Sequence, residues 1–549
     1  MKKQTMFNTV FVCVSILTLV LSACGGLAAT PHPAAVTVVA YSPTREVVAK
    51  EADGPAQPDF FVAPAPGETG LQTGGEVPPN DQAYDAMFFK NYGVNPFIDT
   101  EDDHFSTFAM DVDTASYAVM RRYVNDGNLP PAEAIRVEEF INYFNYDYPA
   151  PESGTSAPDA FAIHLEGAPS PFGGEKYYLL RVGLQGRRIP TDQRKDAVLT
   201  FVIDVSGSMS REDRLGLVKQ ALALLVEELR PTDQVGIVVY GSRGRVVLEP
   251  TPASNASQIM AAINSLQPEG STNAEEGLRL AYQMASRAFR SDAINRVILC
   301  SDGVANVGKT GPDSILKEIK KHADGDITLS TVGFGMGNFN DILMEQLADD
   351  GNGNYAYVDT LDEAHRIFVE NLTGMLQVIA KDAKVQVDFN PELVSRYRLI
   401  GYENRDVADE DFRNDTVDAG EVGSGHNVTA LYEIKFKEDL TGLGDLSGLK
   451  ALTVFVRYQD PETSQVHEIN QGLVLSQFAS AFETTSPRFQ LAASVAEYAE
   501  ILRESYWAKD SSLENVQGLA QRVKEAMPGD ADVAEFAQLV GRAAQIAAR

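Results

Sequence analysis

The sequence predicts an α/β protein whose centre is a Rossmann-like, doubly wound parallel sheet. Between residues 197 and 380, short apolar runs alternate with segments of helical period. The flanking stretches indicate an N-terminal α+β module, a β-sandwich-like domain and a C-terminal helical segment. Apolar strands that alternate with amphipathic helices favour a parallel sheet with helices on both faces. A chain of 549 residues has room for several such units.

The first residues have the pattern of a secretory signal. A basic start (MKK) precedes an apolar run at 10–21 that is too short for a comfortable membrane span. The letters LSAC at 21–24 resemble the bacterial lipobox, whose cysteine is diacylated and becomes the first residue of the mature protein. We therefore expect a lipoprotein signal peptide at 1–23, lipidation at Cys24, and a lipid-anchored, extracytoplasmic protein of the cell envelope.

A tether is expected to follow the anchor. Residues 24–85 are rich in Pro, Ala and Gly and lack sustained hydrophobic periodicity, as in VAPAPGETGLQTGGEVPPN. Such a composition buries too little apolar surface to offset chain entropy, so this segment is predicted to be disordered.

Charge and cysteine usage exclude some function classes. Lys and Arg number 46 against 77 Asp and Glu, which gives a formal net charge of −31. An acidic surface repels phosphate backbones and anionic lipid head groups, so nucleic acid is not an expected partner. Cys13 leaves with the signal and Cys24 carries lipid, so only Cys300 remains and no disulfide framework is possible.

The N-terminal module is predicted at 86–190. It contains two helix-like pieces, TASYAVMRRYVNDG and PAEAIRVEEFINYF, and two strand-like runs, FAIHLEGA and KYYLLRVGLQG. Asp111 and Asp113 follow an apolar run, as at the start of haloacid-dehalogenase phosphatases. Ala115 stands where that pattern needs Thr or Val, and no Rossmann-like pattern follows directly. We interpret the two aspartates as a strand end that caps the next helix.

The α/β region at 197–380 has clear elements. The predicted strands are VLTFVID, QVGIVVYG, RVVLEP, NRVILCSD, ITLSTVGFG and YAYVD. In the first helix, one apolar face is formed by Leu215, Val218, Leu222, Leu225, Val226 and Leu229. Further helices are predicted at 275–289, 314–322, 340–347 and 363–379.

Two further regions complete the chain. Residues 381–480 contain alternating runs such as AKVQVDFN and ALTVFVRYQD, which predict a β-rich domain. If the strands at 160–185 complete its sandwich, the α/β domain is inserted in a β domain. Residues 486–549 predict a helical tail with three helices. The acidic stretch at 409–426 lacks the order of oxygens of an EF-hand, so a solvated loop is expected.

The chemistry concentrates at strand ends of the α/β region. Asp204, Ser206 and Ser208 follow one strand, Asp302 follows another, and Thr272 precedes a helix. Ligands of open α/β sheets bind at the carboxyl ends of the strands. Alternate residues in an extended turn point the same way, so the spacing of the first three aims three oxygens at one point. Hard oxygens suit Mg²⁺, Mn²⁺ or Ca²⁺ rather than zinc.

A serine nucleophile is disfavoured. Neither Ser206 nor Ser208 lies in a G-x-S-x-G elbow. His322 and His365 fall in helical stretches, and no histidine lies in a motif that suggests a base at the carboxyl edge.

On these residues, 197–380 resembles a von Willebrand factor type A (VWA) domain, and the motif matches its metal-ion-dependent adhesion site. The resemblance implies that the metal, most often Mg²⁺, binds Ser206 and Ser208 directly and Thr272 directly or through water. It implies that Asp204 and Asp302 act mostly through water. An acidic residue of a protein partner completes the coordination shell in that family.

The resemblance extends beyond the metal motif. STFAMDVDTASYAVMRRYVNDG and RLIGYENRDVADEDFRNDTVDAGEVGSGH are similar to the flanking regions of bacterial VWA lipoproteins of the YfbK type. We therefore expect a membrane-anchored protein that binds a protein partner through a divalent metal, without catalysis and without a small-molecule substrate. Two alternatives stay open: a metal-dependent hydrolase or phosphatase that uses the same cation, and a structural envelope factor with a vestigial metal site.

Overall fold

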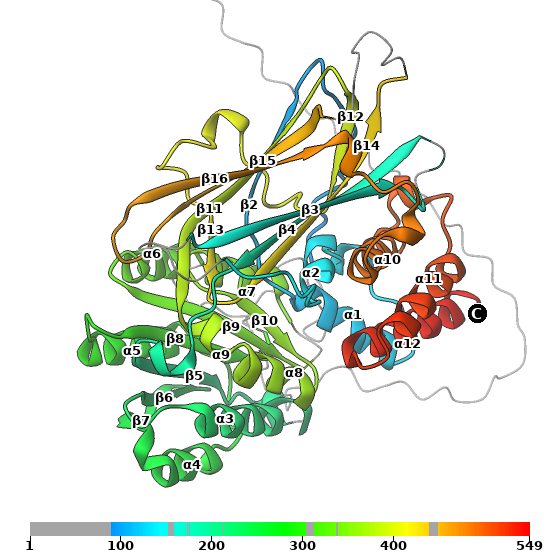
Figure 1. Cartoon of the computed structure of the whole chain (residues 1–549). Helices are drawn as coiled ribbons and strands as arrows, with labels where there is room; N and C mark the ends of the chain where they lie inside the picture. The colour runs from blue at the N-terminus through cyan, green and yellow to red at the C-terminus, as the bar shows by residue number, and fades with distance from the viewer. Residues whose placement is uncertain are drawn as a thin grey trace, which may run out of the picture. The chain divides into compact units, whose positions relative to one another are not determined.

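The computed structural model (Figure 1) describes most of the chain after residue 88. The described ranges are 89–151, 159–172, 174, 176–210, 212–303, 312–335, 339–438 and 448–549. The predicted signal peptide at 1–23, the tether at 24–85 and the lipidation site Cys24 lie outside these ranges.

A six-stranded sheet forms the centre of the α/β domain, in the order β10-β9-β8-β5-β6-β7. Central strand β5 pairs in parallel with β6 and β8, so Val202 lies opposite both Val238 and Leu299. The strands are β5 (Ala197–Asp204), β6 (Gln234–Tyr240), β7 (Gly244–Pro252), β8 (Ile294–Ser301), β9 (Ile327–Phe334) and β10 (Tyr355–Val358). The predicted Rossmann-like fold class is confirmed.

One edge of the predicted parallel sheet carries an antiparallel strand. Strand β7 runs antiparallel to β6, with Tyr240 opposite Gly244. Only residues 241–243 join the two strands. A connection this short closes a hairpin, whereas a parallel pair needs a crossover of a dozen or more residues.

Helices cover both faces of the sheet. On one face α3 (Leu217–Glu228) and α4 (Ala256–Ser265) pack against the side chains of Phe201 and Ile203. On the other face Val202 packs in a separate core with helices α5, α6 and α7. These helices are α5 (Ala274–Ala288), α6 (Pro312–Ala323) and α7 (Asp341–Asp349). Alternate residues of β5 thus enter opposite cores, as strand geometry requires.

The last predicted helix of this domain is divided. The sequence pattern predicts one helix at 363–379, but the structure has α8 (Leu361–His365), a π-helical turn (Arg366–Glu370) and α9 (Leu372–Leu376). Strand β11 (Val378–Phe389) then begins, and the carbonyl of Gln377 accepts the N–H of Ser424. Pairing with a distant strand therefore ends the helix, which local periodicity does not reveal.

Strands from both sides of the α/β domain build the two other sheets. One has the order β1-β12-β14-β4-β3, and the other has the order β13-β11-β15-β16 with β2 also paired to β11. The bounds are β1 (Ile98–Asp99), β2 (Phe105–Ala109), β3 (Phe161–Pro169), β4 (Tyr177–Gly186), β12 (Val394–Ile400), β13 (Gly420–Gly423), β14 (Asn427–Phe436), β15 (Lys450–Gln459) and β16 (Val466–Val474). Strand β4 pairs with β14, so the α/β domain is an insertion between two strands that lie side by side.

A helical core joins the N-terminal and C-terminal segments. Tyr117 and Phe140 of the N-terminal helices share one buried cluster with Tyr498 and Phe536 of the C-terminal helices. The helices are α1 (Ala115–Asn125), α2 (Val137–Asn142), α10 (Pro487–Leu502), α11 (Leu513–Ala526) and α12 (Ala531–Ala547). The three C-terminal helices agree with the predicted helical tail. Throughout the described residues, no helix has the length and apolar composition needed to span a membrane.

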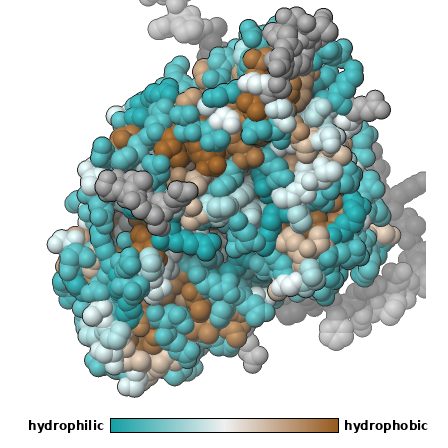
Figure 2. All heavy atoms as spheres, in the orientation of Figure 1, coloured by the Kyte–Doolittle hydropathy of each residue, from teal (hydrophilic) through white to brown (hydrophobic). Residues whose placement is uncertain are grey.

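The visible surface is mostly hydrophilic. Figure 2 shows a face on which hydrophilic residues predominate, with apolar patches between them. Large exposed apolar side chains include Phe289, Leu361, Tyr506 and Trp507.

A buried ion-pair network ties helix α1 to the α/β domain. The Arg121 Nε donates to Asp359 Oδ2 at 2.9 Å, and its Nη2 donates to Glu363 Oε2 at 2.7 Å. The Tyr143 hydroxyl lies 2.6 Å from Arg121 Nη1. All these groups are buried, so removing one partner leaves an uncompensated charge away from water.

Replacing Arg121 with Ala is expected to lower the free energy of unfolding by about 3–5 kcal/mol, because Asp359 and Glu363 stay buried without their cation. The exposed pair Arg396–Asp99 supplies the control, and Arg396→Ala is expected to cost at most about 1 kcal/mol. Urea unfolding of the two variants measures the difference. Equal losses would contradict the role of the buried network.

Candidate metal-binding site

All five residues of the predicted metal motif are described, and they lie on three loops beside the sheet. Asp204 is the last residue of β5, and Ser206 and Ser208 lie in the turn that follows. Asp302 follows β8, the parallel neighbour of β5, and Thr272 precedes α5. Parallel strands end at the same edge, which places the loops after β5 and β8 together.

Hydrogen bonds join four of the five side chains. The Ser206 N–H donates to Asp204 Oδ1 at 2.8 Å, and the hydroxyl oxygens of Ser206 and Ser208 lie 3.0 Å apart. The Ser208 hydroxyl also bonds the Asp302 carboxylate. Outside the motif, Ser301 donates to Asp204 Oδ2 at 3.1 Å. The carboxylates and hydroxyls therefore form one compact oxygen cluster.

Backbone hydrogen bonds hold the segment before Thr272 to the turn after β5. The Gly207 N–H donates to the Gly270 carbonyl at 3.0 Å, and the Glu269 N–H donates to the Val205 carbonyl at 2.5 Å. Gly270 has a φ of +68°, and a Cβ there would collide with the Ser242 hydroxyl. The turn thus needs glycine. Thr272 is 8 % exposed and makes no side-chain hydrogen bond to the other four motif residues.

One side chain at the site was not predicted from the sequence. Arg214 is 4 % exposed, and its Nη1 bonds Asp302 Oδ2 and the Ser208 carbonyl, the latter at 3.0 Å. It lies in a π-helical turn (Glu212–Gly216) that leads into α3. In the sequence, Arg214 is a basic residue beside Leu215, where an apolar helix face begins. An arginine in this position is usually exposed to solvent, so its type alone does not indicate a role at the site.

Burial makes the two carboxyl groups difficult to ionise together. It raises the pKa of Asp204 to about 7, and the nearby Asp302 carboxylate adds to this shift. Burial also raises the pKa of Asp302, while the Arg214 guanidinium and the Ser208 hydroxyl act in the opposite direction. Two buried carboxylates beside one guanidinium favour a further positive charge at this point.

The donor set fits a hard divalent cation. It consists of carboxylate and hydroxyl oxygens, the donor type that Mg²⁺, Mn²⁺ and Ca²⁺ use. Cys300 lies nearby in β8, but it is buried and its thiol pKa is raised, so it is a poor ligand. Among the described residues, no three His, Cys, Asp or Glu side chains form a metal-ligating group. A metal at this position would therefore find hydroxyl oxygens beside the two carboxylates.

Histidine does not activate the two serines of the motif in the part of the chain that the structure describes. Of the hydrogen bonds made by these residues, none joins a histidine to Ser206 or Ser208. His322 stacks on Tyr282, and His365 lies 3.3 Å from Glu370. A serine nucleophile needs a base within hydrogen-bonding reach of its hydroxyl. Neither His322 nor His365 is such a base.

The two aspartates of the N-terminal module serve a structural purpose other than the predicted one. Helix α1 begins after Thr114 without a side-chain cap, so the interpretation of Asp111 and Asp113 as caps is wrong. Asp111 Oδ2 accepts a hydrogen bond from Arg405 at 3.0 Å. Asp113 Oδ1 accepts the Tyr355 N–H at 3.0 Å, which satisfies a backbone donor of the edge strand β10.

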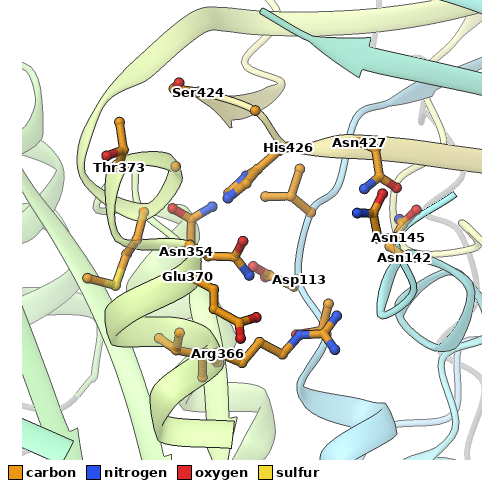
Figure 3. Close-up of a pocket in the computed structure, with 18 of the residues that line it drawn as sticks. Asp113, Asn142, Asn145, Asn354, Arg366, Glu370, Thr373, Ser424, His426 and Asn427 are labelled. Carbon is orange, nitrogen blue, oxygen red and sulfur yellow. The ribbon is translucent and has the colours of Figure 1, made fainter. Parts of the chain in front are cut away.

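A separate cavity of about 590 Å³ lies between the α/β domain and the β-sheets (Figure 3). His426, Asn354 and Glu370 are among the side chains that line it. Burial lowers the pKa of His426 to about 4, and Arg296 adds to this shift. Arg366, also in the lining, is paired with Asp532 at 3.0 Å. None of the five motif residues lines this cavity.

Comparison with protein-family models divides the chain into three matched regions. Residues 83–181 match the model described as von Willebrand factor, and residues 199–304 match the von Willebrand factor type A domain. Residues 374–546 match the C-terminal model of the uncharacterized protein YfbK. The type A match contains all five motif residues.

Two solved structures share the VWA name. The von Willebrand factor type A protein from Catenulispora acidiphila is 16 % identical, with a TM-score of 0.40, over 70 % of this chain and 89 % of that chain. The ArnB paralog VWA2 from Sulfolobus acidocaldarius is 16 % identical, with a TM-score of 0.35, over 71 % of this chain and 97 % of that chain. The fold assignment rests instead on the strand order and the family models.

Curated relatives extend the similarity along most of the chain. Human inter-alpha-trypsin inhibitor heavy chain H4 is 29 % identical over 28 % of this chain and 17 % of its own length. The uncharacterized protein sll0103 of Synechocystis is 25 % identical over 54 % of this chain and 70 % of its own length. The uncharacterized protein YfbK of Escherichia coli is 37 % identical over 82 % of this chain and 80 % of its own length. The chain therefore belongs to the YfbK family of VWA-domain proteins.

Proposed function

We propose that this protein binds a protein partner through a divalent metal held by Asp204, Ser206, Ser208, Thr272 and Asp302. The observation that carries the proposal is the buried oxygen cluster at the ends of β5 and β8, in which two carboxylates and two hydroxyls already contact one another. Mg²⁺ is the preferred cation, and Mn²⁺ and Ca²⁺ are alternatives because they also prefer oxygen ligands.

The partner is proposed to supply an acidic residue to the metal. Five protein ligands of this kind, some acting through water, leave a coordination position for an anionic oxygen. The VWA domain and the YfbK family membership support an interaction role. The strongly acidic chain argues against nucleic acid as that partner.

The protein is further proposed to act at a membrane surface of the cell envelope, on the extracytoplasmic side. The proposal rests on the lipobox-like LSAC at 21–24 and on the apolar run before it. A diacylated Cys24 buries enough CH₂ groups for stable anchoring without a membrane-spanning helix. The Pro-rich segment at 24–85 would then separate the folded part from the membrane.

Catalysis is the main alternative. A hydrolase or phosphatase at this site would use the same cation to activate water and would need a general base beside it. Asp204 and Asp302 are the carboxylates in reach, and both belong to the proposed ligand set. Turnover of generic ester or phosphate substrates that disappears in Asp204→Ala would overturn the non-catalytic proposal. A structural envelope factor with a vestigial site is the third possibility, and it predicts no metal binding.

The mature protein is expected to bind Mg²⁺ or Mn²⁺ in isothermal titration calorimetry, and EDTA should abolish the signal. Ser206→Ala is expected to weaken binding by at least about tenfold, because even outer-shell changes cost this much at metal sites. Ser210→Ala is the matched control, since Ser210 is exposed in the same turn and outside the motif. Absence of binding by the unaltered protein at millimolar metal would contradict the proposal.

Replacing Cys24 with Ala is expected to release the protein from the membrane fraction, because the acyl chains have no other attachment point. Fractionation of cells followed by mass analysis of the N-terminus measures anchoring and acylation. Cys13→Ala is the matched control, since that residue leaves with the signal. Membrane retention of Cys24→Ala protein from which residues 1–23 have been removed would refute lipid anchoring at this residue.

A protein partner is expected to be captured from native membranes in the presence of Mg²⁺ and lost on addition of EDTA. Ser206→Ala should lose the same band, whereas Ser210→Ala should keep it, because only the former alters the metal ligands. Chemical crosslinking before extraction identifies the partner. Capture that is insensitive to both EDTA and Ser206→Ala would show that the interaction uses another surface.

A further inference from the structure

Arg214 is a cation built into the metal motif itself. Its Nη1 lies 3.0 Å from the Ser208 carbonyl and also bonds Asp302 Oδ2. Ser208 and Asp302 both belong to the proposed ligand set. Among the described residues, Arg214 is the one cationic side chain that bonds a side chain of the motif. The same carboxylate is thus a partner for the guanidinium and for a divalent cation.

The position of Arg214 is defined by packing as well as by charge. Gly335, directly after β9, has a φ of +74°, and a Cβ at Gly335 would lie 2.5 Å from Arg214 Cγ. The missing side chain therefore makes room for the aliphatic part of the arginine. The residue begins in a π-helical turn, a local irregularity that often occurs at functional sites. Two separate segments thus direct the guanidinium to Asp302.

The Arg214 guanidinium and a bound divalent metal would repel each other. The cluster holds two buried carboxylates, Asp204 and Asp302, and one of them is already paired with a guanidinium. A divalent metal bound at Ser206 and Ser208 would lie beside that fixed positive charge and next to two buried carboxyl groups, where like charges repel each other more strongly than in bulk water. Arg214 and a metal would both draw on the negative charge of Asp302, so each cation weakens the hold of the other on this carboxylate.

We propose that Arg214 is an internal competitor of the metal, which lowers the affinity of this site for divalent cations by holding Asp302. The inference rests on the proposed metal-binding function and adds its regulation. An acidic partner residue brings negative charge to the same point and offsets the repulsion between the two cations. Metal and partner therefore bind with positive coupling, because a ligand that relieves the repulsion favours both events equally.

The test compares Mn²⁺ affinity in the mature chain and in its Arg214→Gln and Arg214→Met variants. Both variants remove the charge, and methionine keeps an apolar stem to pack at Gly335. We expect Mn²⁺ to bind at least about fivefold more tightly to both, within the usual range of coupling between sites. Arg214→Lys, which keeps the charge, should stay near the unaltered affinity. Arg287→Ala removes an exposed charge elsewhere and controls for net charge.

A thermal readout checks the same competition without partner or activity. In EDTA, Arg214→Met is expected to melt below the unaltered protein, because Asp302 loses its cation. Saturating Mn²⁺ should raise the melting temperature of the variant more than that of the unaltered protein, since tighter ligands stabilise more. Circular dichroism before melting establishes that each variant is folded.

The outcomes separate the two proposals. Unchanged or weaker Mn²⁺ binding in both Arg214→Gln and Arg214→Met would overturn competition and assign Arg214 a positioning role at Asp302. The metal-binding function would still stand in that case, provided that the unaltered protein binds Mn²⁺ and that Ser206→Ala binds it at least about tenfold more weakly. Failure of the unaltered protein and of both Arg214 variants to bind Mn²⁺ would overturn the proposed function, and the inference with it.

Discussion

The parallel pairing of β5 with β8 is the constraint on which the candidate site depends. Its register places Ile203 opposite Cys300, so Asp204 lies beside Ser301 and Asp302 follows directly. Two carboxyl groups are thereby brought together at a buried sheet edge, where burial and mutual repulsion raise the pKa of Asp204 to about 7. The two carboxyl groups are the feature with which the other parts of the site interact. These parts are the hydroxyls of Ser206 and Ser208, the guanidinium of Arg214 and the proposed metal.

The sequence was sufficient to predict the part of the site that follows from strand order. Asp204, Ser206 and Ser208 stand directly after an apolar run, and strand ends of a parallel sheet share one edge. Arg214 was not predictable, because its role depends on Gly335 lying beside it, over a hundred residues along the chain. The division of the helix at 363–379 was missed for a similar reason, because the pairing of β11 with β13 is a tertiary effect. The antiparallel direction of β7 was missed although the short connection at 241–243 is a local signal for a hairpin.

The rest of the fold holds the inserted α/β domain at both of its ends in the sequence. Strands β4 and β14 lie side by side although the whole α/β domain separates them in sequence. Arg121 of α1 binds Asp359, directly after β10, and Glu363 of α8. The metal motif lies at other loops, after β5 and β8, so the buried ion pairs are structural and do not compete with it. Membership in the YfbK family covers this whole arrangement rather than the VWA domain alone.

The most direct measurement is anomalous diffraction from crystals of the mature protein soaked in millimolar Mn²⁺. We expect one strong peak within coordination distance of the Ser206 and Ser208 hydroxyls, in the range of about 2.0–2.6 Å that spans Mg²⁺–oxygen and Ca²⁺–oxygen bonds. We also expect the bond between Arg214 and Asp302 to lengthen when the ion is present. An absent peak at this position, with Arg214 still bonded to Asp302, would contradict the central claim that the cluster is a metal site.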